Sequence, residues 1–128
     1  MHEPKPTILI VEDDPDVREL ATIVLAMAGY RVIEAANGDE AVFLLATREN
    51  PHIDMLFTDI VMPGRLDGIN LAHTARELLP DLRVLYTTGN ADAAPAGQRA
   101  ARHGPVLRKP YRPTELRAAV RAVLGEAG

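Results

Sequence analysis

Five short runs of aliphatic and β-branched residues alternate with longer segments of helical periodicity, and this alternation constrains the fold more than any other feature of the chain. Runs of this kind and length predict β-strands. They occupy residues 7–11, 31–35, 54–58, 83–87 and 105–108. The first, third and fourth are almost continuously apolar, which is typical of parallel strands covered by helices on both faces.

The segment after the first strand has the apolar spacing of an amphipathic helix over about residues 15–28. Asp14 before Pro15 predicts an N-cap followed by proline in the first turn, and Gly29 suits the left-handed position after the helix end. We therefore interpret Asp14 as a capping residue. The apolar residues expected to dock on the sheet are Val17, Leu20, Ala21, Val24, Leu25 and Ala28.

Two later stripes predict helices between the third and fourth strands and after the fifth strand, where Pro113 and Gly125 bracket the helix. Segment 91–103 is rich in alanine but is interrupted by Pro95 and Gly97, so its helix should be short, irregular or mobile. The stripe residues are Leu71, Ala72, Ala75, Leu78 and Leu79, followed by Leu116, Ala119, Val120, Val123 and Leu124.

Length and composition set the outer limits. The chain has the size of one domain, which we place at 1–128, with residues 1–6 as a polar leader and no effector domain after Gly125. The net charge of −4 argues against a nucleic-acid partner. No apolar run approaches the ~20 residues of a membrane helix, so we expect no membrane insertion and a cytoplasmic location. Without Cys, a bound metal must use oxygen or imidazole ligands.

This pattern predicts a (βα)5 α/β fold, a doubly wound open parallel sheet with right-handed crossovers and a binding site at the carboxyl ends of its strands. Polar residues stand at four of those ends. Glu12 and Asp13 follow the first strand, Asp59 the third, Thr87 the fourth and Lys109 the fifth. We expect these side chains to converge in one crevice.

The chemistry follows from this convergence. Three carboxylates in one crevice repel each other unless a cation joins them, and Mg²⁺ accepts carboxylates together with phosphate oxygens. Asp59 could then attack phosphorus and form an aspartyl phosphate. The hydroxyl of Thr87 and the ammonium of Lys109 would hold the remaining phosphoryl oxygens. Neighbouring Thr88 should face the other side of its strand, so we favour Thr87.

Four ordered blocks resemble the signatures of response-regulator receiver domains, the chemotaxis-regulator-like phosphoacceptors of two-component phosphorelays. They are ILIVEDDP from Ile8, TDIVMPG from Thr58, VLYTTG from Val84 and LRKPY from Leu107. The resemblance implies a flavodoxin-like strand order 2-1-3-4-5, Mg²⁺ as cofactor and a cis Lys109–Pro110 bond. The implied roles are Asp59 as phosphoacceptor, Asp13 as direct metal ligand, Glu12 as ligand through water, Val61 as ligand through its backbone carbonyl, Thr87 as switch hydroxyl and Lys109 as phosphate partner.

The implied function is a signalling switch rather than an enzyme, with no reaction beyond its own phosphorylation and dephosphorylation. A histidine kinase or histidine phosphotransfer protein would phosphorylate Asp59, and the face of the fourth helix, fifth strand and fifth helix would change for a downstream protein partner. A homodimer is an open alternative for the output.

Several features keep other readings open. The pair Arg65-Leu66 lengthens a loop as in receivers of hybrid histidine kinases, so a phosphate sink or an autoregulatory domain of such a kinase is an alternative. Val106 replaces the aromatic that rotates in many members. A Mg²⁺-dependent aspartyl-phosphate phosphatase is disfavoured, because it needs a second carboxylate where this chain has Val61.

Overall fold

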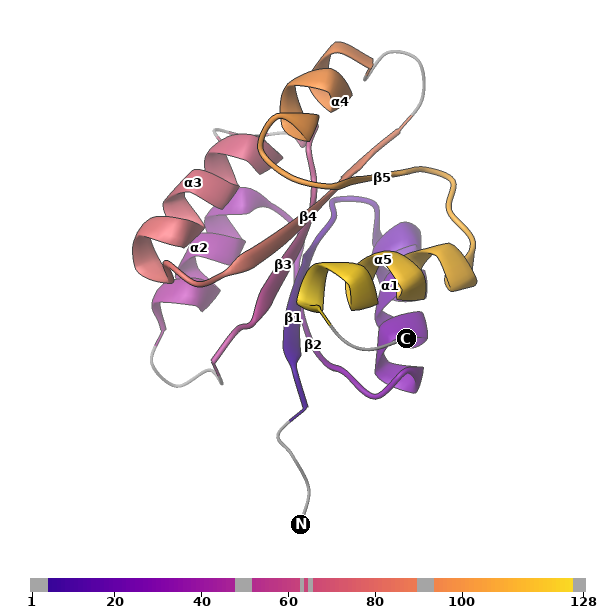
Figure 1. The fold of residues 1–128 in the computed structure, drawn as a ribbon. Helices are drawn as coiled ribbons and strands as arrows, with labels where there is room; N and C mark the ends of the chain where they lie inside the picture. Colours follow the sequence, from indigo (N-terminus) through magenta and orange to yellow (C-terminus); the bar gives the residue numbers. More distant parts are fainter. Residues whose placement is uncertain (1–4, 48–51, 63, 65, 90–93, 126–128) are drawn as a thin grey trace.

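The computed structural model describes residues 5–47, 52–62, 64, 66–89 and 94–125, and for 94–97 it describes the backbone only. Five parallel strands form one sheet with helices on both faces (Figure 1). The strands are β1 (Thr7–Val11), β2 (Arg31–Ala35), β3 (Met55–Asp59), β4 (Arg83–Thr88) and β5 (Val106–Arg108). The helices are α1 (Pro15–Met27), α2 (Gly38–Ala46), α3 (Gly68–Leu78), α4 (Ala94–Ala101) and α5 (Pro113–Leu124).

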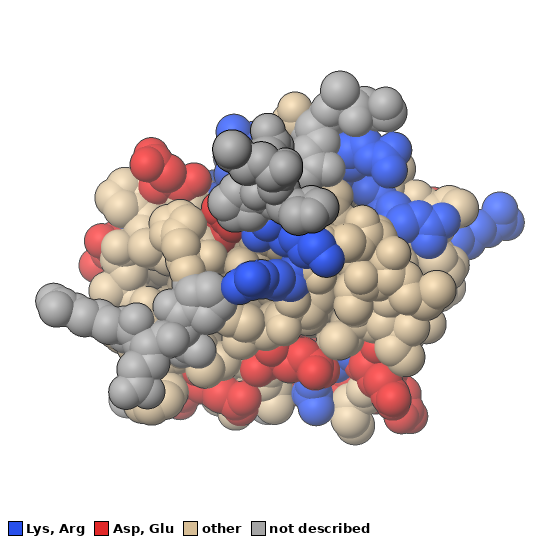
Figure 2. Space-filling view, turned by 90° about the horizontal axis from the view of Figure 1, so that it is seen from below, with Lys and Arg blue, Asp and Glu red and all other residues tan. Residues whose placement is uncertain are grey.

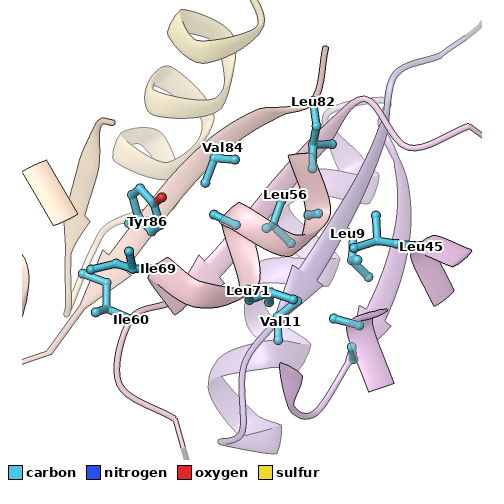
Figure 3. Close-up of a cluster of buried hydrophobic side chains, with 14 of the residues drawn as sticks. Leu9, Val11, Leu45, Leu56, Ile60, Ile69, Leu71, Leu82, Val84 and Tyr86 are labelled. Atoms are coloured by element: carbon cyan, nitrogen blue, oxygen red, sulfur yellow. The ribbon is translucent and has the colours of Figure 1, made fainter. Parts of the chain in front are cut away.

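The strand order is β2-β1-β3-β4-β5, which confirms the predicted topology. Alternate side chains of each strand enter two cores. Leu9 and Val11 of β1 pack with α2, α3 and α4, while Ile8 and Ile10 pack with α1 and α5. Figure 3 shows the first of these cores, in which Leu56, Val84 and Tyr86 from β3 and β4 lie beneath α3, among other labelled side chains.

The helix ends agree with the sequence. The Asp14 carboxylate accepts hydrogen bonds from the amides of Asp16 and Val17, so it caps α1 as predicted. Gly29 has a φ of 102° after α1, and Gly125 has a φ of 73° after α5. Both glycines therefore take the left-handed conformation expected of them. Helix α4 is short, as expected, with only 8 residues.

Part of the predicted helix packing is wrong. Leu20 and Leu78 were expected to dock on the sheet, but they are 49% and 44% exposed, and Ala28 is exposed as well. A helix lying on a sheet buries only the centre of its apolar stripe, whereas these residues lie on its flank or at its end. The strand bounds also shift slightly, because β3 extends to Asp59 and β4 extends to Thr88.

Figure 2 shows the end opposite the carboxyl ends of the strands, where Lys and Arg lie near the middle of the face and carboxylates lie mainly along its lower edge and left side. Among the described residues, no helix is long and apolar enough to cross a membrane.

Candidate functional site

Three carboxylates meet at the carboxyl end of the sheet. One oxygen from each of Glu12, Asp13 and Asp59 lies within 4.8 Å of the others. Glu12 and Asp13 follow β1, and Asp59 ends β3, which pairs directly with β1. Glu12 and Asp59 are buried, whereas Asp13 is exposed. The cluster therefore has a buried floor with one carboxylate turned towards solvent, and the predicted convergence holds.

Lys109 reaches across the sheet end to this cluster. Its Nζ lies 2.5 Å from Glu12 Oε1 and 2.9 Å from Asp59 Oδ2. Burial lowers the pKa of Lys109, but the hydrogen bonds that its ammonium donates to Glu12 and Asp59 outweigh that effect, so its pKa lies above the ordinary 10.5. Lys109 is therefore charged and bridges two of the three carboxylates.

The backbone holds the buried acids in place. The amide of Asp14 donates to Glu12 Oε2 at 3.1 Å, and the Arg18 guanidinium donates to the Glu12 carbonyl at 2.7 Å. Burial raises the pKa of Glu12 above 4.5, although its hydrogen bonds with Lys109 and the Asp14 amide oppose the rise. Asp59 Oδ1 accepts a hydrogen bond of 3.3 Å from the Val61 amide. These contacts fix the carboxylate orientations.

Sequence reasoning missed Gly68, which positions Asp59. Its amide donates to the Ile60 carbonyl at 2.8 Å. A Cβ on Gly68 would lie 2.2 Å from the Asp59 carbonyl oxygen and 2.8 Å from Ile60 Cα, much too close for any side chain. Helix α3 can therefore start against the end of β3 only because residue 68 is glycine. The adjacency of Asp67 and Gly68 in the sequence gives no sign of this contact.

Two threonines end β4, and both hydroxyls are buried without a hydrogen-bond partner. Thr87 is the register partner of Asp59, so the two side chains lie on the same face of the sheet, towards α1 and α5. Thr88 lies on the other face with Tyr86, towards α3 and α4. An unpartnered buried hydroxyl is costly, which makes each a candidate for a contact formed only in another state.

The donor set fits Mg²⁺. It offers only hard oxygen ligands, and an imidazole is absent from the acidic cluster found among the described residues. Three carboxylates beside one ammonium leave a surplus of negative charge that one divalent cation balances.

Comparison with known proteins agrees with this geometry. The response regulator receiver domain family matches residues 8–121. This chain belongs to that family. The receiver is 42% identical over 110 residues to the response regulator receiver protein CpdR of Brucella abortus, covering 85% of this chain and 88% of that protein. It spans about half the length of several further curated relatives.

Solved structures of receiver domains are similar to this chain over most of its length. The receiver domain of the hybrid histidine kinase CckA is 33% identical, with 92% and 98% of the two chains covered and a TM-score of 0.75. A response regulator receiver protein from Sinorhizobium medicae is 28% identical, with 94% and 95% covered and a TM-score of 0.81. The predicted fold and family are confirmed, and the chain is a phosphoacceptor receiver of a two-component system.

Other predicted features of the receiver can now be placed. The Lys109–Pro110 bond is cis. Val106 is half-buried in the core beneath α4 and is the register partner of Tyr86. The Val61 side chain is exposed, which is compatible with a role for its backbone alone. Arg65 lies outside the described residues, while Leu66 packs against the start of α2 at Gly38. The described histidines are all exposed.

Proposed function

We propose that Asp59 accepts the phosphoryl group from a phosphohistidine of a histidine kinase or phosphotransfer protein. An Asp59 carboxylate oxygen attacks phosphorus, the P–N bond breaks, and the imidazole leaves with a proton from solvent. The observation that carries the proposal is the Lys109 ammonium, 2.9 Å from Asp59 Oδ2 and beside the acidic cluster. It places a fixed positive charge where a phosphoryl oxygen would arrive.

Mg²⁺ would supply charge neutralisation on the transferring oxygens. We assign its binding to Asp13 and Asp59 directly, to Glu12 through water and to the Val61 carbonyl. Exposed Asp13 leaves a route for the ion from solvent, and buried Glu12 is held by Lys109 and the Asp14 amide.

The direct test is a mass measurement. The protein is incubated with Mg²⁺ and a small-molecule phosphodonor, and a gain of one phosphoryl group is expected. Asp59→Asn is the matched control, since it removes the nucleophile but keeps the size of the side chain. An unmodified wild type, or equal labelling of the variant, would refute the assignment of Asp59.

Thr87 and Thr88 are separate candidates for the hydroxyl that contacts the phosphoryl group. The shared register and face with Asp59 favour Thr87. The position of Thr88 on the face covered by α4 favours that residue, because movement of its hydroxyl would change the packing beneath α4. Thr87→Val and Thr88→Val separate them. The switch residue is the one whose loss abolishes the phosphorylation-dependent change in hydrogen exchange at 98–108 while Asp59 is still labelled.

The alternative is that the chain acts as a phosphate sink or as an autoregulatory domain of a hybrid kinase. The similarity to the CckA receiver favours it. This role would be supported if the phosphorylated receiver returned its phosphoryl group to a phosphotransfer protein and bound no downstream protein. Binding of a downstream protein to the phosphorylated receiver would support the signalling switch instead. In either role we place the protein in the cytoplasm, with protein partners rather than nucleic acid.

A further inference from the structure

Two exposed histidines meet between α3 and the end of α4, two helices that cover the same face of the sheet (Figure 1). His73 lies midway along α3, and His103 follows the last residue of α4 by two positions. The centroids of their rings are 5.2 Å apart, and the ring planes meet at 83°. Within the described part of the chain, neither imidazole has an ion pair or a hydrogen bond. The phosphoryl chemistry proposed above uses neither of them.

The backbone beneath each ring is held by buried neighbours. His73 lies between Ala72 and Ala75, which are both buried against the sheet. The amide of His103 donates a hydrogen bond of 2.8 Å to the carbonyl of Ala100, and Ala100 is itself fully buried. The fold therefore sets the separation of the two backbones and leaves only the side-chain torsions free. Ligands held in this way lose little freedom when they bind an ion.

The separation of the rings matches that of two imidazoles on one metal ion. A Zn–N bond of about 2.0–2.1 Å puts each ring centre about 3.2 Å from the ion, so tetrahedral coordination separates the two centres by about 5.2 Å. The observed separation of the centroids is 5.2 Å. The last torsion of a histidine side chain is soft. Turning the exposed rings can therefore direct one nitrogen of each towards a common point while the backbone stays in place.

The nearest charges on these helices suit a cation. Glu77 is exposed and lies four residues after His73, so its carboxylate is on the same side of α3. Arg99 lies one turn before His103, but its guanidinium is already paired with the Asp67 carboxylate at 2.9 Å. A cation between the two rings would thus gain from the charge of Glu77, while the charge of Arg99 is neutralised.

We propose that His73 and His103 bind a divalent transition-metal ion of the zinc class, with water in the remaining coordination positions. Imidazole suits Zn²⁺, whereas Mg²⁺ prefers oxygen ligands, so this ion is distinct from the one assigned to the carboxylates. Ala100 is the one buried side chain among residues 98–101, the part of α4 whose side chains are described. An ion that joins His103 to α3 would therefore fix the end of α4 against the rest of the receiver.

The test is a calorimetric titration of the full chain with ZnCl₂ in an excess of Mg²⁺, which occupies the carboxylate cluster. His73→Gln and His103→Gln each remove one imidazole and keep a polar side chain. Both positions are exposed, so folding should be unaffected, and thermal unfolding checks this. His52→Gln is the matched control, because it removes an exposed imidazole just before β3. The second readout is hydrogen exchange at residues 98–104 with and without Zn²⁺.

We expect one Zn²⁺ per wild-type chain and at least about a tenfold loss of affinity in each of the two variants, since even the loss of a residue behind a ligand costs about 10–100-fold. The His52→Gln control should bind Zn²⁺ within about twofold of the wild type. Zn²⁺ should slow exchange at 98–104 in the wild type and the control, but not in the two variants. Wild-type affinity in either variant, or exchange at 98–104 that Zn²⁺ leaves unchanged, would overturn the proposal.

Discussion

Replacing Gly68 by alanine tests whether packing at the start of α3 sets the position of Asp59, the proposed phosphoacceptor. The new Cβ would lie 2.2 Å from the Asp59 carbonyl oxygen, whereas ordinary contacts begin at 3.4 Å. Backbone must therefore separate by roughly 1 Å, and overpacking of this kind costs about 1–3 kcal/mol. Alanine regains up to about 1 kcal/mol through its greater helix preference. The net loss of unfolding free energy should be about 1–2 kcal/mol.

For a domain of this size that loss corresponds to a fall in Tm of roughly 4–8 °C. Urea and thermal unfolding measure it, and Gly89→Ala is the stability control because nothing lies within 4 Å of its added Cβ. The second readout is labelling by acetyl phosphate at a temperature where both proteins are folded. A displacement of this size at a reacting group can cost about a hundredfold in rate, so we expect at least a tenfold loss. Wild-type stability together with a wild-type labelling rate would refute the reasoning.

Three further predictions concern groups around the site. Lys109→Met should lower the free energy of unfolding without Mg²⁺, because Glu12 and Asp59 lose their shared cation. Added Mg²⁺ should narrow the difference in unfolding free energy between the variant and the wild type, measured by urea unfolding. A difference that Mg²⁺ leaves unchanged would contradict the shared role of the two cations. Burial, and then the charge of Glu12, raises the pKa of Tyr111 to about 12 from 10.0, so the folded protein keeps the phenol proton between these pH values and the unfolded chain loses it. The stability that this group contributes therefore falls as pH rises through that window, and Tyr111→Phe should flatten the fall. An absorbance titration in which the variant keeps the wild-type transition near pH 12 would contradict the assignment to Tyr111. Asp67→Ala should cost about 1–2 kcal/mol through loss of the α3 cap, whereas Arg99→Ala, which breaks only the 2.9 Å surface pair with Asp67, should cost at most about 1 kcal/mol, and a double-mutant cycle separates the two contributions.

The convergence of Asp13, Asp59 and Lys109 could be predicted because parallel strands bring their carboxyl ends to one edge of the sheet. It needs only the strand order and the position of each residue just after an apolar run. The capping role of Asp14 was predictable for a different reason, because it depends only on residues that are close to it in the chain.

Features that depend on how separate elements approach each other could not be read in this way. The position of Leu20 on the flank of α1 depends on the angle at which the helix lies on the sheet. Helix α2 has apolar residues around much of its circumference, including exposed Phe43. Its sequence therefore shows no single apolar stripe from which the helix could be predicted. The contact of Gly68 with Asp59 arises between segments joined by a loop whose path the sequence does not specify.

Strand β5 also determines how this receiver can meet other proteins. It is an edge strand of only 3 residues, enclosed by Pro105 and Pro110 and ending at exposed Arg108. Prolines donate no backbone hydrogen bond, and a short charged edge is a poor template for another strand. The molecule can therefore be concentrated or brought against a second copy with little tendency to extend its sheet. Recognition along this edge has to be made by side chains, so it can be altered by substitution without rebuilding the backbone.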